Sequence, residues 1–221
     1  MNIDQYHVVE AKHSKLGAII HEVNVGEETK ICRYSKIYGG LAWATFSFSA
    51  CYQLWGEEYV SGTRYEGQEA PRGKLRFFVE RRIDSFFLQE LFRPLADDCT
   101  LYLCTEVFAN LDEEHEDEAK HFQEFVHSNK ININLAEPPY SSLSLRLSLL
   151  KQYTDKGYVD LPENSVVRKE LQQLTRSSIE EVDQFPSILA LSHVIAGFHR
   201  FGGPPRRPFT PKRTKTVRRY R

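Results

Sequence analysis

Three short segments near the start of the chain, each alternating apolar and polar side chains, constrain the fold most. They cover residues 6–9, 16–23 and 29–38. Alternation with a period of two is typical of strands that bury one face. Turn-forming residues at 12–15 and 24–28 separate the three segments. These connections are too short for a crossover helix, so we predict three consecutive strands in an antiparallel meander.

The remainder of the chain alternates helical and strand patterns. Residues 39–75 lack a clear period, and we interpret them as an insertion, in which the apolar run at 41–56 fits a strand pair or a buried helix and residues 62–73 fit an exposed loop. A meander followed by a strand-helix-strand unit predicts an α/β fold, with a mixed five-stranded sheet flanked by helices. We expect one domain over residues 1–201. The predicted elements after the insertion are a helix at 75–92, a strand at 100–107, a helix at 112–127, a strand at 131–135, and helical segments at 141–153, 166–174 and 184–199.

Charge is divided unevenly along the chain. The net charge is −1, yet residues 202–221 contain eight basic residues and no acid, which leaves about −9 for residues 1–201. Four prolines in this tail predict a disordered basic arm, and its charges can neutralise phosphates without a fold. A localisation signal or a solubility arm is the alternative interpretation. The basic residues are Arg206, Arg207, Lys212, Arg213, Lys215, Arg218, Arg219 and Arg221.

Several classes of protein are disfavoured by composition. No stretch approaches the roughly 20 apolar residues of a membrane-spanning helix, and the polar N-terminus lacks an apolar signal core. The four cysteines, Cys32, Cys51, Cys99 and Cys104, form no CxxC pair and have no histidine at zinc spacing. We therefore expect a cytoplasmic protein without a membrane partner, a structural zinc site or a disulfide framework.

The predicted order of elements is that of the RNase H-like nuclease fold. In that fold, carboxylates come from the first strand, the end of the fourth strand and a late helix. The matching residues here are Glu10, Glu106 and Asp183. Such a set would hold two Mg²⁺ or Mn²⁺ ions, one activating a water molecule and the other stabilising the leaving oxygen. The structural alternatives are an exposed strand end for Glu10 and a helix N-cap for Asp183.

Two stretches also resemble a known family. YHVVEAKHSKLGAIIHEV at 6–23, and LKQYTDKGYVDLPENSVVRKELQQLTR with EEVDQFPSILALSHVIAG at 150–197, resemble the nuclease domain of phage terminase large subunits. The resemblance covers about residues 5–37 and 98–199. It implies DNA cleavage and, as a partner, a separate packaging motor or portal protein. The chain departs from the family by carrying Glu10 where Asp is usual, and it contains no GxxxxGK[ST] phosphate loop.

Two functional hypotheses follow. The first is a metal-dependent endonuclease that cleaves DNA at Glu10, Glu106 and Asp183. The second is a catalytically inactive nucleic-acid-binding or viral assembly protein that uses the basic arm. In both, DNA is favoured over RNA as the nucleic acid.

Overall fold

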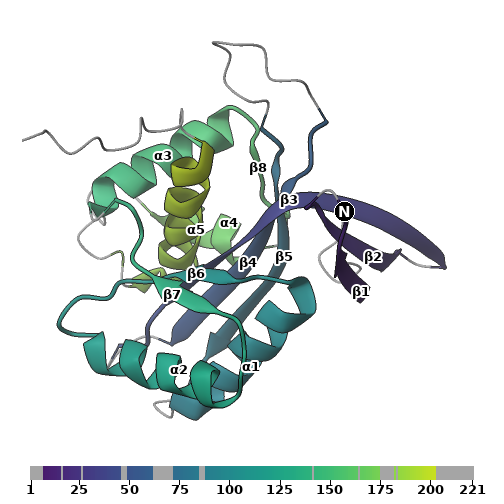
Figure 1. Cartoon of the computed structure of the whole chain (residues 1–221). Helices are drawn as coiled ribbons and strands as arrows, with labels where there is room; N and C mark the ends of the chain where they lie inside the picture. The colour runs from purple at the N-terminus through teal and green to yellow at the C-terminus, as the bar shows by residue number, and fades with distance from the viewer. Residues whose placement is uncertain are drawn as a thin grey trace, which may run out of the picture.

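The structure is a computed structural model of the chain. It describes residues 7–15, 17–25, 27–45, 49–61, 72–84, 88–140, 142–163, 165–174, 182 and 184–202. The described residues form eight strands in one sheet and five helices (Figure 1). The basic tail beyond residue 202 lies outside them.

The sheet is built on a long antiparallel run of strands. Its order is β1-β2-β3-β4-β5-β8, and β6 pairs with β3 while β7 pairs with β6. β3 with β6, β6 with β7, and β5 with β8 are parallel pairs. The strands are β1 His7–His13, β2 Ile19–Val25, β3 Glu28–Ala42, β4 Ala50–Glu58, β5 Leu75–Ile83, β6 Glu106–Phe108, β7 Asn134–Ala136 and β8 Val159–Asp160.

Five of these strands form an RNase H-like core. They lie in the order β5-β4-β3-β6-β7, with an antiparallel meander of β3, β4 and β5 and two further strands parallel to β3. The predicted fold class is therefore confirmed, but the predicted assignment of its strands is wrong. The meander begins at β3, and β1 with β2 forms an additional hairpin on the first half of β3. The reason is that β3 is 15 residues long and pairs with β2 along one half and with β4 along the other.

Residues 39–75 are not an insertion where they are described. They contain the end of β3 and all of β4, the two central strands of the core. β4 is almost completely buried because the sheet is covered on both faces, so Ala50–Gly56 shows an apolar run interrupted only by Gln53 instead of alternation.

Two other elements were predicted with the wrong type of secondary structure. Residues 75–83, predicted as helix, form β5, and the predicted strand at 100–107 contains the end of helix α1 and the start of the short strand β6. Pro94 lies within α1 and does not end a helix there. The predicted later helices are confirmed. The helices are α1 Leu88–Tyr102, α2 Glu116–Ser128, α3 Leu143–Asp155, α4 Val166–Gln173 and α5 Pro186–Gly202.

Helices cover the sheet on two sides (Figure 1). Alternate residues along the central strands divide between two buried clusters. Ile37 and Leu54 belong to the cluster that includes α1 and α2, whereas Tyr38 and Trp55 belong to the cluster with α3, α4 and α5. Because successive strand side chains point to opposite faces, the sheet forms the middle of three layers.

Helix α5 lies directly on the middle of the sheet. It packs against β3 and β4. A Cβ atom at Gly40 of β3 would stand 2.0 Å from the carbonyl oxygen of Ala190. Glycine at this position therefore permits the helix backbone to approach the strand, which fixes where the start of α5 lies relative to the strand ends.

Candidate functional site

The three carboxylates predicted to bind metal occupy unrelated positions. Glu10 lies on β1 and is 54% exposed, with its carboxylate 3.0 Å from Lys12 Nζ. Glu106 is the first residue of β6, and its carboxylate accepts a hydrogen bond of 2.7 Å from Lys36 Nζ. Asp183 lies outside the described residues. Each described carboxylate thus has its own lysine partner.

Strand register separates Glu10 from Glu106. Glu10 pairs with Glu22 and, through it, aligns with Ile31 of β3. Glu106 precedes Val107, which pairs with Gly39 of the same strand. At about 3.3 Å per residue, Ile31 and Gly39 are separated along β3 by about 26 Å. Two metal ions stand about 4 Å apart in a two-metal centre, so Glu10 and Glu106 do not share one.

Glu106 also lies at the opposite end of its strand from the one expected. The sequence predicted a strand over 100–107, with Glu106 at its carboxyl edge, where open α/β sheets bind ligands. In the structure β6 begins at Glu106 and ends at Phe108. The apolar run before it is the last turn of α1 and the residues that follow it, in which Tyr102 and Cys104 are buried and Leu101 is exposed.

The carboxyl edge of β3, β6 and β7 has both apolar and polar side chains among the described residues. Ala42, at the end of β3, packs with Cys51, Leu189 and Ala190 in a small apolar cluster. A shallow hollow of about 180 Å³ lies beyond the ends of β6 and β7. Its lining residues are Asn110, Leu111, Asp112, Glu137, Pro138 and Arg146.

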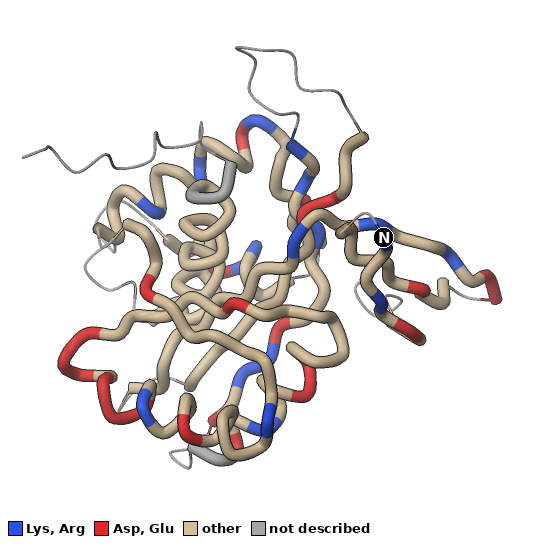
Figure 2. Tube along the Cα trace, in the orientation of Figure 1, with Lys and Arg blue, Asp and Glu red and all other residues tan. Residues whose placement is uncertain are grey.

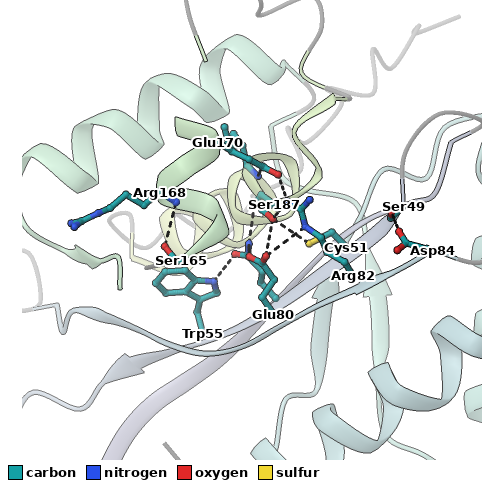
Figure 3. Close-up of polar contacts among 12 residues, drawn as sticks. Ser49, Cys51, Trp55, Glu80, Arg82, Asp84, Ser165, Arg168, Glu170 and Ser187 are labelled. Carbon is teal, nitrogen blue, oxygen red and sulfur yellow. Dashed lines mark hydrogen bonds and ion pairs between the residues drawn. The ribbon is translucent and has the colours of Figure 1, made fainter. Parts of the chain in front are cut away.

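A buried polar network lies at the same edge, between the sheet and helices α4 and α5 (Figure 3). Glu80 and Arg82 of β5 share one face of the strand, and Glu170 reaches them from α4. Arg82 contacts the Glu170 carboxylate and donates to Ser187 Oγ at 2.7 Å, and its Nε lies 3.7 Å from Glu80. Ser187 Oγ in turn donates to Glu80 at 2.9 Å.

The network also joins the start of α5 to the sheet. The Ile188 backbone N–H donates to the second Glu170 oxygen at 3.1 Å, so Glu170 satisfies one of the unpaired amides of the helix N-terminus. Gln53 on β4 donates both to Glu80 at 2.7 Å and to the Ser187 carbonyl at 3.0 Å. α4, α5, β4 and β5 are thereby connected through one set of hydrogen bonds.

Burial perturbs both carboxyl groups of this network. Desolvation raises the pKa of Glu80 and of Glu170 above the ordinary value of 4.5, and the charge of Arg82 opposes the rise in each case. The side chains of Glu80 and Glu170 are 11% and 8% exposed, whereas that of Arg82 is 35% exposed. Paired carboxyl groups with perturbed pKa values are typical of functional sites and of structural ion-pair networks alike.

The described residues do not fit a two-metal centre. No group of three or more Asp, Glu, His or Cys side chains within the described part of the chain could hold an ion. Glu80 and Glu170 already share the Arg82 guanidinium, and their oxygens accept hydrogen bonds from Ser187, Gln53 and the α5 backbone. A cation at this place would have to displace Arg82.

Sequence reasoning missed this network for an identifiable reason. Glu80 and Arg82 fall in the segment predicted as helix, where residues two positions apart point in different directions. On a strand they share a face. Glu170 could have been noticed, because it stands three residues after the buried Val167 and therefore lies on the buried side of α4.

The other predicted site residues lie outside the described residues. These are the eight basic residues of the tail, Arg206, Arg207, Lys212, Arg213, Lys215, Arg218, Arg219 and Arg221. Their contact with nucleic acid stays a prediction.

Comparison with known proteins gives a partial structural resemblance. No protein-family model matches the chain, and no curated protein matches it. Among solved structures, the large terminase nuclease from the thermophilic phage G20c with bound zinc has a TM-score of 0.48 at 11% identity, covering 87% of this chain and 94% of that one. The fowlpox virus Holliday junction resolvase has a TM-score of 0.42 at 11% identity, covering 75% and 98%.

None of the helices among the described residues is long and apolar enough to cross a bilayer.

Proposed function

We propose that this protein binds nucleic acid, DNA in preference to RNA, through its basic tail, and that the RNase H-like body acts in binding or assembly without cleaving. The observation that carries the proposal is the charge division of the chain. Residues 202–221 carry eight positive charges and no acid, against about −9 on the rest. Positive charges on an extended arm neutralise phosphates and release counterions, which supplies sequence-independent affinity.

The negative charge of the body supports the assignment of nucleic acid binding to the tail. The loop and first turn leading into α2 carry a run of acidic residues (Figure 2). Basic residues of β5 are in ion pairs, such as Arg76 with Glu58 and Arg81 with Asp98. Phosphates approaching these surfaces would meet neutralised or negative groups, whereas the tail sequence carries positive charge without any acid.

Salt dependence tests the proposal. Binding of a fluorescein-labelled DNA duplex is measured by polarisation between 50 and 300 mM NaCl, for the whole chain and for a variant with Arg206, Arg207, Arg218 and Arg219 changed to Gln. Each lost phosphate contact reduces the slope of log K against log[salt] by about 0.9, so the slope should fall by about 3 to 4. The same assay with single-stranded DNA and RNA tests the preference for DNA.

A matched control removes positive charge from the body. Arg93→Gln and Lys151→Gln change exposed residues whose partners are helical neighbours. Together they should leave the slope unchanged. An unchanged slope in the tail variant, or an equal loss in the control, would refute a role for the tail.

A metal-dependent endonuclease is the second candidate. It is favoured by the RNase H-like strand order, which brings the carboxyl ends of β3 and β6 together beside the first turns of α5. Helix α5 begins at Pro186, three residues after Asp183 in the sequence. In this case Asp183 would be a ligand for Mg²⁺ or Mn²⁺. Glu10 and Glu106 cannot both join it in one centre, since register separates them along β3.

Plasmid cleavage distinguishes the two candidates. The purified chain is incubated with supercoiled DNA and Mn²⁺ or Mg²⁺, beside Asp183→Asn, Glu106→Gln and Glu10→Gln variants. Our proposal expects no metal-dependent nicking together with salt-sensitive binding. Nicking that requires metal and disappears in Asp183→Asn would replace it with the endonuclease.

The sequence resemblance to terminase nuclease domains extends the proposal to an assembly role. A separate packaging motor or portal protein is then the class of partner expected. Co-purification of the chain with such a partner, retained after nuclease treatment of the sample, tests this role independently of DNA binding.

A further inference from the structure

Helix α1 ends in a turn whose first and last residues, Cys99 and Cys104, are joined through the backbone. The backbone N–H of Cys104 donates to the Cys99 carbonyl at 2.8 Å, and that of Leu103 donates to the Thr100 carbonyl at 3.3 Å. Leu103 lies in the left-handed region with a φ of 58°. These two hydrogen bonds and the left-handed residue define a Schellman motif, which is frequently accompanied by a side-chain contact between its first and sixth residues.

In this protein both residues of that contact are cysteines. Their thiols are free and buried, with relative exposures of 0% for Cys99 and 2% for Cys104. The backbone hydrogen bond between Cys104 and Cys99 holds their side chains at the two ends of one turn. The neighbouring Cys104 thiol and burial raise the pKa of the Cys99 thiol well above its ordinary value of 9.0.

The remaining cysteines lie on other elements. Cys51, on β4, is 3.7 Å from Ser187 Oγ, and Cys32 is a half-buried residue of β3. Cys104 also donates to the backbone carbonyl of Glu106 at 3.3 Å, so it connects the end of α1 to the first residue of β6. The pair is therefore placed between two elements of the core.

We propose that Cys99 and Cys104 are an oxidation site, at which a hydroperoxide converts the dithiol into a disulfide that fixes the last turn of α1 to the start of β6. The Cys104 sulfur attacks one peroxide oxygen as a thiolate, giving a sulfenic acid and releasing water. The Cys99 sulfur then attacks the Cys104 sulfur, and the sulfenic oxygen leaves as a second water. Two thiols and one hydrogen peroxide thus become one disulfide and two waters.

Burial determines the rate of this reaction. Thiols react as thiolates, and a buried, hydrogen-bonded thiol remains protonated. The last turn of α1 has to open before peroxide reaches the pair, and helix ends open more easily than helix centres. Oxidation should accordingly be slow in the native protein, and glutathione or thioredoxin would return the pair to the dithiol.

Thiol counting and peptide mapping test the inference on the full chain. Hydrogen peroxide treatment of the native protein should reduce the four free thiols to two and the intact mass by about 2 Da. A Cys99–Cys104 linked peptide should appear, and dithiothreitol should remove it. Because a short loop is closed, Tm should rise by several degrees, on the order of 5 °C.

Two variants make the assignment specific. Cys104→Ser should abolish the crosslink, whereas Cys32→Ser should leave it intact. Four thiols remaining after peroxide, a disulfide between other cysteines, or a gain in mass by oxygen without a crosslink would each overturn the inference. If Cys104→Ser fails to fold, the peptide map of the unmodified sequence decides the outcome by itself.

Discussion

Replacing Arg82 by methionine should destabilise the junction between the sheet and helices α4 and α5. Arg82 contacts both Glu80 and Glu170. Methionine keeps a similar apolar stem and removes the charge, which leaves two buried carboxylates without this cation. Removing one partner of a buried ion pair costs about 3–5 kcal/mol. Since the Arg82 side chain is 35% exposed, water replaces part of its effect, and we expect a loss of about 2–3 kcal/mol at pH 7.

The loss should depend on pH in a definite direction. Burial raises the pKa of Glu80 and of Glu170 above 4.5, so the folded protein binds these protons more tightly than the unfolded chain does. The contribution of these two groups to stability is therefore fully present below about pH 4.5 and is lost as the pH rises through the two folded values. Without Arg82 both pKa values rise further. The variant should therefore lose less stability at pH 5 than at pH 7.

Urea unfolding followed by circular dichroism at both pH values measures this loss. Arg93→Met is the control, because its ion pair with Asp97 is exposed and such pairs contribute about 0.5 kcal/mol or less. Wild-type stability in Arg82→Met at pH 7 would refute the reasoning, as would an equal loss at pH 5 and pH 7.

Two further predictions concern the core. Burial lowers the pKa of His193 to about 3, so its contribution to stability is present above pH 6.5 and is lost as the pH falls. His193→Asn should reduce the slope of unfolding free energy between pH 7 and 5 by about 1 kcal/mol per pH unit. The same substitution at the exposed His121 is the control. In urea unfolding, Gly40→Ala should cost about 1–3 kcal/mol or more, because the added Cβ would meet the Ala190 carbonyl at 2.0 Å. Lys30→Ala, at an exposed position on the same strand, should cost less than about 0.5 kcal/mol. An equal change of slope in His121→Asn would contradict the first prediction, and an equal loss of stability in Lys30→Ala would contradict the second.

Local patterns predicted most elements that have one exposed face. The first three strands and helices α2 to α4 follow from period-two and helical spacing, because solvent on one side imposes alternation on the sequence. Helix α5 was also predicted from its helical spacing, although almost all of its described side chains are buried. β4 is buried on both faces, and the last turn of α1 carries the exposed Leu101 beside the buried Cys99 and Tyr102. Their apolar runs fit a strand and a helix equally well, and this ambiguity produced the false insertion and the false strand at 100–107.

The candidate site shows the same limit. Glu10 and Glu106 were chosen for their positions at the ends of predicted strands, and that choice assumed which strand comes first in the core. The first strand of the core is β3, because β1 and β2 form an additional hairpin before it. Glu10 therefore lies outside the core, on β1. Glu80, Arg82 and Glu170 meet only because β5 and α4 pack around the start of α5.

The sequence by itself determined the α/β class, the uneven charge and most helix positions, since these depend on local periodicity and on composition. Only the tertiary structure decided which strands form the RNase H-like core and which charged side chains share a site. Strand partners are chosen by long-range register and by the two layers that cover the sheet. The residue pattern of a single segment contains no information about either its register with distant strands or the layers that cover it.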